Sequence, residues 1–364
     1  MADDFMPLLG WDYLELWVGN AKQAAYFYEH ALGFARTAYS GPETGIRDRA
    51  SYVLEQGDIR LVVSSALREE HEITRHNARH GDGVRDIALT VPDATEAYRQ
   101  AVSRGARGVA EPHRLADDFG SMELSAIATY GDTIHTFVDR SDYAGPFKPG
   151  FVSVSTNGST KGPGLTNIDH VVGNVELGRM NQWVEFYERV FGMTNILHFG
   201  DEQIHTEYSA LMSKVMSDGS GKIKFPINEP AEGKRKSQIE EYIEFYGGAG
   251  AQHIALATTD IVETVKMLKE HGLVFLDTPD SYYEEAPGRV GEIDQDYEDL
   301  QRHRILADRD EDGYLLQIFT KTAQDRPTLF FEVIERHGAT GFGEGNFKAL
   351  FEAIEREQAL RGNL

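Results

Sequence analysis

Three side chains that could bind a metal stand in the second half of the chain: His170, His253 and Glu332. Each lies in a run in which apolar residues alternate, as Ile168 and Val172 do around His170, and such alternation predicts a strand with one buried face. A carboxylate on a buried face is costly unless a cation pairs with it. Two histidines and one carboxylate with open coordination positions are the ligand set of non-haem Fe(II) oxygenases. Zinc accepts the same three ligands, although the sequence has no HExxH motif to present them from a helix.

An internal repeat sets His170 and His253 apart from the other histidines. The matching segments are 81–105 (GDGVRDIALTVPDATEAYRQAVSRG) with 248–272 (GAGAQHIALATTDIVETVKMLKEHG), without a gap, and 11–34 with 167–193. In this register Asp86 corresponds to His253 and Tyr13 corresponds to His170. Strands related by duplication should surround one cavity, so the repeat predicts a single metal site per chain. Several other histidines stand in polar stretches and are expected at the surface: His71, His76, His80, His198 and His205.

Both halves repeat one order of elements, and these elements must position the candidate ligands. The predicted elements, given for the first half and then the second, are an alternating strand (13–18; 168–175), a helix that ends at a glycine (Gly33; Gly192), a second strand (87–91; 254–257) and a helix that opens with a capping pair (Asp93 and Glu96; Asp260 and Glu263). The plan of strand, helix and further strands therefore occurs about four times, twice in each half.

The boundary between the halves is marked by composition. Ser, Thr, Gly and Pro concentrate in residues 153–164 (SVSTNGSTKGPG), so we expect one domain over residues 1–155 and a second over residues 165–364. Residues 278–302, which are acidic and rich in tyrosine, are interpreted as a surface insertion or a lid. The chain closes with an amphipathic helix that has no counterpart in the first half, and its apolar positions are Phe347, Leu350, Phe351 and Ile354.

The bulk composition limits the class of function. The chain has 364 residues, enough for two domains, and a formal net charge of −23, which repels nucleic acid and anionic membrane surfaces. It contains no cysteine, so disulfides and thiolate catalysis are excluded. No apolar run reaches the ~18 residues that a membrane span needs, and the start MADDFMPLLGWDYLEL lacks the basic region of a secretory signal. These observations predict a cytoplasmic protein that binds neither nucleic acid nor membrane.

The duplicated modules resemble the vicinal oxygen chelate superfamily, which is built from βαβββ units. The second half closely resembles the 4-hydroxyphenylpyruvate dioxygenase family, and the resemblance extends over nearly the whole chain. The segments that carry it are FPINEP (225–230), KRKSQIEEYIEFYGGAGAQHIAL (234–256), LLQIFTK (315–321), DRPTLFFEVIER (325–336) and GFGEGNFKALFEAIE (341–355). The resemblance implies an α+β fold with two domains of tandem βαβββ modules, each forming a curved mixed sheet, and an added C-terminal helix.

The same resemblance implies a chemistry. One Fe(II) per chain is expected on His170, His253 and Glu332. The family's substrate, 4-hydroxyphenylpyruvate, carries its own 2-oxo acid, so no 2-oxoglutarate is needed. With O2 this substrate gives homogentisate and CO2 through oxidative decarboxylation, ring hydroxylation and side-chain migration, a step of tyrosine and phenylalanine catabolism. A homo-oligomer, either a dimer or a tetramer, is also expected.

Further site residues follow from the resemblance, residue by residue. Polar groups that act at the reaction centre are expected at Ser213, Asn228, Gln238, Gln252 and Gln317. Groups expected to contact the substrate, with the phenylalanines as aromatic walls, are Pro226, Phe319, Phe330, Phe342, Asn346 and Phe347. Taken alone, such polar residues would rather cap turns, and such phenylalanines would rather fill a core.

One pair of these residues raises a geometric question. Gln252 and His253 are neighbours in sequence, and neighbours on a strand point to opposite faces. Both can reach the site only if the chain bends, which the glycine-rich segment 247–250 permits. Asn346 and Phe347 begin the terminal helix, so we expect this helix to close the cavity as a gate.

Three other functions remain open at this point. 4-Hydroxymandelate synthase uses the same substrate, iron and O2 but hydroxylates the benzylic carbon, and the aromatic Phe319 and the full FPINEP segment favour the dioxygenase. An extradiol ring-cleaving dioxygenase shares the fold and ligands but needs an acid–base histidine near the metal, for which His198 and His205 are the local candidates. A non-catalytic binding protein would be expected to lack the intact ligand set.

The first half carries no such ligand set. Tyr13 and Asp86 replace the histidines, and GPFKPGF (145–151) offers no third carboxylate. We therefore expect the first half to support the fold and an oligomer contact rather than to catalyse.

Overall fold

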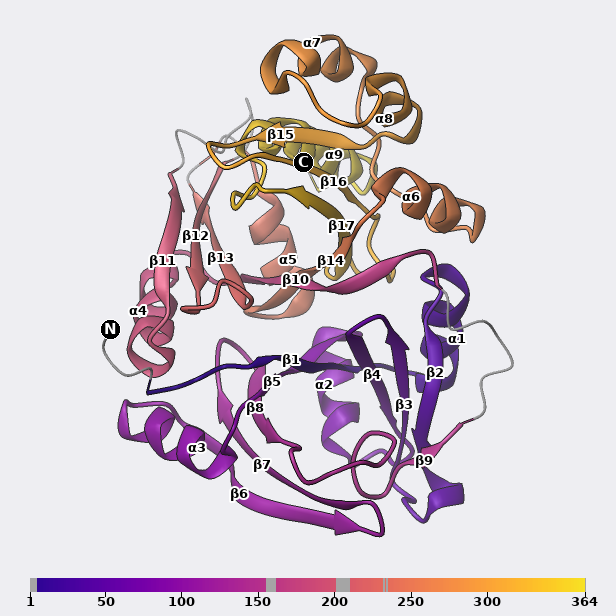
Figure 1. The fold of residues 1–364 in the computed structure, drawn as a ribbon, viewed down its shortest axis with the longest axis vertical. Coiled ribbons are helices and arrows are strands. Elements are labelled where there is room, and N and C mark those ends of the chain that lie inside the picture. Colours follow the sequence, from indigo (N-terminus) through magenta and orange to yellow (C-terminus); the bar gives the residue numbers. More distant parts are fainter. Residues whose placement is uncertain (1–4, 155–161, 201–209, 232, 234, 364) are drawn as a thin grey trace.

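The computed structural model describes residues 5–154, 162–200, 210–231, 233 and 235–363. Figure 1 shows two curved sheets, one from each half of the chain, with helices packed around both. Within the described residues, the sheet of the first half has nine strands and the sheet of the second half has eight. This arrangement of helices and two curved mixed sheets confirms the expected α+β fold class.

The first sheet contains two copies of one module, which consists of a strand, a helix and three further strands. The first copy is β1 (Gly10–Trp17), α1 (Ala21–Ala31), β2 (Ala35–Ser40), β3 (Arg49–Gln56) and β4 (Ile59–Ala66), with η1 (Pro42–Thr44) between β2 and β3. The second copy is β5 (Gly83–Thr90), α3 (Ala94–Ser103), β6 (Gly108–Asp117), β7 (Gly120–Ala128) and β8 (Ile134–Asp139). The helix α2 (Glu72–His80) joins the copies, and β9 (Val152–Ser153) pairs with β2.

The second sheet repeats this plan and adds to it. Its first copy is β10 (Leu165–Asn174), α4 (Met180–Phe191), β11 (Thr194–Phe199), β12 (Ala210–Ser217) and β13 (Lys224–Ala231). After the joining helix α5 (Gln238–Tyr246), the second copy is β14 (Gly250–Thr258), α6 (Ile261–Glu270), β15 (Leu306–Arg309), β16 (Tyr314–Phe319) and β17 (Phe330–His337). The additions are α7 (Asp280–Val290) and α8 (Tyr297–His303) before β15, and η2 (Glu344–Asn346) and α9 (Phe347–Leu360) at the end.

The strand order confirms the duplication. The first sheet runs β2-β3-β4-β1 and then β5-β8-β7-β6, apart from the short β9 at its edge. The second sheet runs β11-β12-β13-β10 and then β14-β17-β16-β15, which is the same order. In both sheets the opening strands of the two modules pair antiparallel. Consequently β10, β14 and β17, which carry the three candidate ligands, are adjacent.

Helix ends follow the signals in the sequence. Asp93 accepts a hydrogen bond from the backbone nitrogen of Glu96 at 2.8 Å, and Asp260 accepts one from that of Glu263 at 3.0 Å, so each caps its helix. α4 ends at Gly192, whose φ of +69° lies in the left-handed region. The helices α2 and α5 were not predicted, because a helix of nine residues shows too few turns for a clear apolar period.

The segment 278–302 forms the helices α7 and α8 on the outside of β15, so a surface insertion was the correct interpretation. In the described part of the chain, no helix combines the length and the apolar character that crossing a membrane requires.

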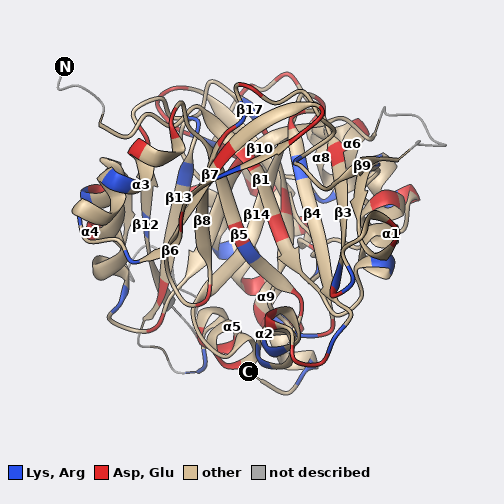
Figure 2. Cartoon of the chain, turned by 90° about the horizontal axis from the view of Figure 1, so that it is seen from below, with Lys and Arg blue, Asp and Glu red and all other residues tan. Residues whose placement is uncertain are grey.

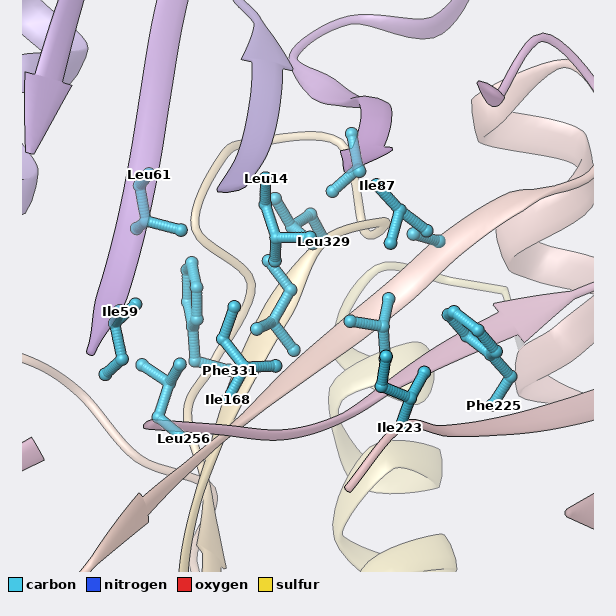
Figure 3. Packing of buried hydrophobic residues seen from close by; sticks show 14 of the residues in the cluster. Leu14, Ile59, Leu61, Ile87, Ile168, Ile223, Phe225, Leu256, Leu329 and Phe331 are labelled. Carbon is cyan, nitrogen blue, oxygen red and sulfur yellow. The ribbon is translucent and has the colours of Figure 1, made fainter. Parts of the chain in front are cut away.

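One hydrophobic core lies between the two sheets. Figure 3 shows side chains of both halves pointing toward one another, among them Leu14, Leu61 and Ile87 from the first sheet and Ile168, Leu256 and Phe331 from the second. Burying one such side chain contributes about 1.5 to 3 kcal/mol, so each half stabilises the other. The division into domains at residues 1–155 and 165–364 therefore stays a prediction about the chain, since one core serves both parts.

Candidate metal centre

The second sheet brings His170, His253 and Glu332 together. Ala255 of β14 lies opposite both His170 of β10 and Glu332 of β17, so the two ligand candidates flank it on neighbouring strands. Glu332 Oε2 lies 3.2 Å from His170 Nε2 and 3.4 Å from His253 Nε2. The candidate ligand atoms of all three residues lie within 4.8 Å of one another, and all three side chains are buried. This group can hold one metal ion.

The alternation around His170 is interrupted on one side. Val172 shares the cavity with His170, as expected, but Ile168 lies in the core between the sheets together with Val171. The pairing of β10 with β14 shifts register between Ile168 and His170, and this irregularity turns Ile168 to the opposite face. The expectation that Ile168 and His170 share a face is therefore wrong.

Hydrogen bonds orient both imidazole rings. His170 Nδ1 donates to Asp169 Oδ1 at 2.7 Å, and His253 Nδ1 donates to Gln252 Oε1 at 3.1 Å. Asp169 is itself held by Arg336, whose Nε and Nη2 lie 2.7 and 2.9 Å from its two oxygens. With Nδ1 carrying the proton, each ring presents the lone pair of Nε2 toward Glu332, which is the tautomer that metal binding requires. Asp169 and Arg336 were not predicted from the sequence, although Asp169 is one residue from His170 and Arg336 is four residues from Glu332.

The electrostatics of the group favour a cation. Burial by itself would raise the pKa of Glu332, but the neighbouring His170 and His253 lower this pKa to about 2, so the carboxylate is ionised at neutral pH. Burial opposes a charge on His170, yet the carboxylates of Glu332 and Asp169 prevail and raise the pKa of this imidazole. Burial lowers the pKa of His253, and the charge of His170 acts in the same direction. A metal ion would replace the proton that Glu332 draws to this group.

A cavity opens beside the three residues, and most of the site residues expected from the resemblance line it. Of the polar residues it contains Ser213, Asn228, Gln238 and Gln252. Of the proposed substrate contacts it contains Pro226, Phe319, Phe330, Phe342 and Phe347. Its wall also includes residues that the sequence analysis did not assign to the site: Val172, Phe199, Leu211, Val215, Leu350 and Phe351. The alternation of Leu211, Ser213 and Val215 along β12 could have indicated this wall.

Gln252 and His253 both line the cavity, because β14 contains a bulge. His253 pairs with Val172 and Ala251 pairs with Gly173, so Gln252 is an extra residue between two consecutive partners. The expected bend therefore exists, but it lies within the strand and not in the glycine-rich segment 247–250. The Gln252 amide hydrogen-bonds to the ring of His253 rather than standing free in the cavity.

Gln317 and Asn346 are buried but do not line the cavity. Gln317 packs against Gly343. A Cβ atom added to Gly343 would stand 2.5 Å from Gln317 Nε2. Asn346 Oδ1 accepts hydrogen bonds from Tyr282 Oη at 2.6 Å and from Arg289 Nη2 at 3.2 Å. In this structure Asn346 thus fixes the start of α9 to α7, and its role as a substrate contact stays a prediction.

The terminal helix forms part of the cavity wall, whereas the insertion does not. Phe347, Leu350 and Phe351 of α9 line the cavity. No described residue of α7 or α8 lines it, so the interpretation of this insertion as a lid over the cavity is wrong. Tyr282 and Arg289 of α7 instead hold the beginning of α9 in place.

In the first half, a hydrogen-bond network occupies the position of the metal group. Asp86 Oδ2 accepts from Tyr13 Oη at 2.9 Å and from Thr136 Oγ1 at 2.6 Å. Asp86 pairs with Ile134, and Thr136 stands two residues further along that strand. In the same way, His253 pairs with Phe330, and Glu332 stands two residues further along. The third position is therefore Thr136 and not part of segment 145–151. Burial raises the pKa of Asp86 to about 6.

The segment 145–151 fills the interior of the first sheet. Phe147 and Phe151 belong to the buried cluster of that interior, and the Phe147 ring packs edge-on against Tyr13 with ring centres 5.3 Å apart. The interior of the first sheet is thus filled by aromatic side chains, whereas the second sheet has a cavity there.

The other histidines differ in their surroundings. His198 is exposed on β11, as predicted. His76 and His80 are buried at 7% and 1% exposure, so the prediction that they are surface residues is wrong. Both face the second half of the chain through Tyr246, a contact that a polar stretch does not reveal. His205 lies outside the described residues.

The chain is similar in sequence to known proteins. A family model described as hydroxyphenylpyruvate dioxygenase, N-terminal, matches residues 3–148. A second, described as the glyoxalase/bleomycin resistance protein/dioxygenase superfamily, matches residues 167–318. The chain is 48% identical to 4-hydroxyphenylpyruvate dioxygenase from Yarrowia lipolytica, with 98% of this chain and 93% of the relative covered. It is 47% identical to the enzyme of that name from Dictyostelium discoideum, with 98% and 100% covered.

A solved structure is also similar. A mutant of 4-hydroxymandelate synthase from Streptomyces coelicolor is 35% identical, with a TM-score of 0.88. The match covers 97% of this chain and 100% of that one. The whole arrangement of two curved sheets is therefore shared with a protein of experimentally determined structure.

Proposed function

We propose that this chain, which belongs to the 4-hydroxyphenylpyruvate dioxygenase family, converts 4-hydroxyphenylpyruvate and O2 to homogentisate and CO2. The observation that carries the proposal is the buried group of His170, His253 and Glu332 at the wall of an aromatic cavity. The reaction would comprise oxidative decarboxylation of the 2-oxo acid, hydroxylation of the ring and migration of the side chain.

The three residues fit Fe(II). They offer two imidazole nitrogens and one carboxylate, which is the ligand pattern of non-haem Fe(II) oxygenases. Hydrogen bonds to Nδ1 of both rings fix the tautomer in which Nε2 is free to bind a cation. When bound, Fe(II) supplies the activation of O2 and the oxidising power, which no amino-acid side chain provides.

Charge explains how a 2-oxo acid would be held. Two neutral imidazoles and one carboxylate leave a divalent ion with a net positive charge. Lys and Arg are absent from the described residues that line the cavity. The carboxylate of the substrate would therefore find its counter-charge at the metal, which directs the reacting end of the molecule to His170, His253 and Glu332.

The rest of the cavity matches a phenol ring. Phe319 and Phe330 have ring centres 6.3 Å apart at a steep angle, and Phe342 packs edge-on against the His170 ring at 4.9 Å. Such faces and edges accept an aromatic ring in stacked or perpendicular contact. Ser213 and Asn228 pair across β12 and β13, on the side of β10 away from Glu332, where they can hydrogen-bond the far end of the substrate.

Oxidative chemistry needs a cavity that excludes water, and the terminal helix supplies part of that wall. Phe347, Leu350 and Phe351 of α9 present apolar surface to the cavity. Water held away from the reacting atoms cannot intercept reactive intermediates or hydrolyse them.

4-Hydroxymandelate synthase activity is the second candidate, because a solved structure of that name matches nearly the whole chain. Both activities begin with the same substrate and metal, so they differ in which carbon is hydroxylated. Extradiol cleavage is disfavoured, because His170 and His253 are the sole histidines among the described residues of the cavity wall.

Product identification tests the proposal. Protein loaded anaerobically with Fe(II) is mixed with 4-hydroxyphenylpyruvate and then with O2, and the products are separated and weighed by mass spectrometry. Homogentisate and CO2 in equal amounts support the dioxygenase. 4-Hydroxymandelate with CO2 would favour the synthase reaction, and absence of CO2 would contradict both.

A further inference from the structure

The turn between α5 and β14, residues 246–250, lies against the first half of the chain. Figure 2 shows α5 beside α2, which belongs to the first half. This turn is three residues from His253, and it follows the helix that begins with Gln238. The turn therefore connects, along the chain, the cavity-wall residue Gln238 with the proposed metal ligand His253.

Side chains of the first half bind the end of α5. His80, which is buried, donates from Nδ1 to the carbonyl oxygen of Tyr246 at 2.5 Å, and its Nε2 lies 2.8 Å from Asp132 Oδ2. Arg79 donates from Nε and Nη2 to the carbonyl oxygen of Gly247 at 3.1 and 2.9 Å. The last carbonyl groups of a helix lack partners within it. Here their partners come from the first half.

Close packing supports the same turn. A Cβ atom at Gly131 of the first half would stand 2.1 Å from the carbonyl oxygen of Ala249. The ring of His80 stacks on the ring of Tyr246, with centres 4.3 Å apart. The two halves thus fit at this point without space for one additional methyl group.

The first half contacts the strand of the other histidine in a similar way. Asp58 donates from its backbone nitrogen to the carbonyl oxygen of Thr166 at 2.6 Å. Gln56 Oε1 accepts from the backbone nitrogen of Leu165 at 3.0 Å. These contacts hold the beginning of β10, which continues to His170.

From these contacts we infer that the first half positions the residues of the metal group. It holds the starts of β10 and β14, and so it sets the separation of His170 and His253 before any metal binds. His80 and Gly131 are positioning residues for His253, and residues 56–58 serve His170. Metal affinity depends on ligands held to a fraction of an ångström, so a small displacement of β14 should be measurable at the metal.

The test uses the full chain and Co(II), which binds such sites and reports their geometry through visible absorption. His80→Ala removes the hydrogen bonds to Tyr246 and Asp132, and Gly131→Ala forces a methyl group against Ala249. Two matched controls accompany them. Gly221→Ala introduces a side chain at a left-handed φ of +70° with no neighbour within 4 Å, and Leu124→Ala cuts a buried side chain in the interior of the first sheet.

We expect His80→Ala and Gly131→Ala to weaken Co(II) binding about tenfold and to shift its absorption bands, at the lower end of the effect of losing support for ligands. Both controls should bind Co(II) like the unmodified chain, even where urea unfolding shows that Leu124→Ala is less stable. Unchanged Co(II) affinity and absorption in His80→Ala, the variant without added bulk, would overturn the inference. Equal weakening by Leu124→Ala would also overturn it, because general destabilisation would then suffice.

The inference rests on the metal group of the proposed function but not on its substrate. A chain that binds Co(II) at this group yet, when loaded with Fe(II) instead, releases no CO2 from 4-hydroxyphenylpyruvate would refute the proposed function alone. A chain that forms homogentisate while His80→Ala binds Co(II) normally would refute the positioning role alone.

Discussion

At the scale of single residues, Asp169 links a proposed metal ligand to the charge network of the sheet. It accepts from His170 Nδ1 at 2.7 Å and from two nitrogens of Arg336. These partners overcome burial and hold the pKa of Asp169 well below its ordinary value, so the side chain is a carboxylate. A carboxylate behind the ring raises the basicity of the ligand nitrogen.

We predict that Asp169→Asn weakens Fe(II) binding by about 10- to 100-fold, the usual effect of losing such a partner. The amide keeps the shape of the side chain but loses the charge. Anaerobic competition with a chelator would measure the affinity. Asp260→Asn is the control, because asparagine caps a helix as well as aspartate does. Equal Fe(II) affinity for Asp169→Asn and the unmodified chain would contradict the assigned role.

The raised pKa of Asp86 in the first half leads us to predict that the stability of the fold depends on pH. Its pKa is about 6 in the folded chain, against an ordinary value of 3.8, because burial disfavours its charge. Well below pH 4 the group is protonated in both states and costs nothing. Between pH 4 and pH 6 the unfolded state loses its proton first, so the folded state is penalised, and above pH 6 the penalty is complete at about 3 kcal/mol.

Asp86→Asn removes this ionisation. The gain in unfolding free energy of the variant over the unmodified chain should therefore increase by about 2.5 kcal/mol between pH 4 and pH 8. Urea unfolding of both proteins at several pH values would measure the difference. A difference that is constant over this range would mean that folding does not raise the pKa of Asp86.

The residues that could be predicted from sequence are those that the repeat places in register. His170 and His253 follow from the alignment of the two halves, and Glu332 follows from the cost of burying a carboxylate. The bulge at Gln252 and the placement of Gln317 behind Gly343 could not be predicted, because both depend on pairing between strands. The burial of His80 likewise arises from a contact between halves.

At the scale of elements, α9 is held at both ends by other parts of the second half. Asn346 at its start binds α7, and Arg361 just beyond its end lies 3.0 and 2.7 Å from the two carboxylate oxygens of Glu241 on α5. Glu241 is buried, so it depends on these partners. The ion pair of Arg361 with Glu241 thus holds the end of α9, the helix that is expected to act as a gate.

We predict that Arg361→Ala loosens the end of α9. Losing a hydrogen bond between charged groups should lower the local opening free energy by about 1 to 3 kcal/mol. Hydrogen exchange of the α9 amides should then accelerate by about tenfold or more, while exchange in β14 stays unchanged. Arg302→Ala, which removes an exposed ion pair within α8, is the control. Unaltered hydrogen exchange of the α9 amides in Arg361→Ala would show that the ion pair with Glu241 does not hold this helix in place.

The elements themselves were largely predictable from periodicity and helix signals. The strands β1, β5, β10 and β14 and the caps at Asp93 and Asp260 lie where the sequence indicates them. The helices of the insertion were not, since Pro287 stands inside α7 and interrupts any helical pattern in the sequence.

At the scale of the whole molecule, the two halves share one buried core. The buried cluster between the sheets contains residues from both, and aromatic pairs such as Trp11 with Phe225 cross the boundary. Neither half can expose this face to water without a large loss of burial. The sequence pattern shows where each sheet begins, and for this reason it suggested two domains. It does not show how the two sheets pack against each other.

We predict that the chain unfolds in one transition. In a chain with Trp11→Phe and Trp17→Phe, tryptophan fluorescence reports Trp183 of the second half alone. This fluorescence and circular dichroism should give the same midpoint in urea as hydrogen exchange of β4 in the first half. Phe331→Ala, which creates a cavity between the sheets, should shift all three midpoints together. Separate midpoints for the two halves would contradict a single core and support the division at residues 1–155 and 165–364.

We propose above that one Fe(II) per chain binds among His170, His253 and Glu332. Crystals of the chain prepared anaerobically with Fe(II) would test it through anomalous scattering measured on both sides of the iron absorption edge. We predict one iron peak per chain, within bonding distance of both Nε2 atoms and the Glu332 carboxylate. A peak elsewhere, or no peak among these residues at full Fe(II) saturation, would contradict the account.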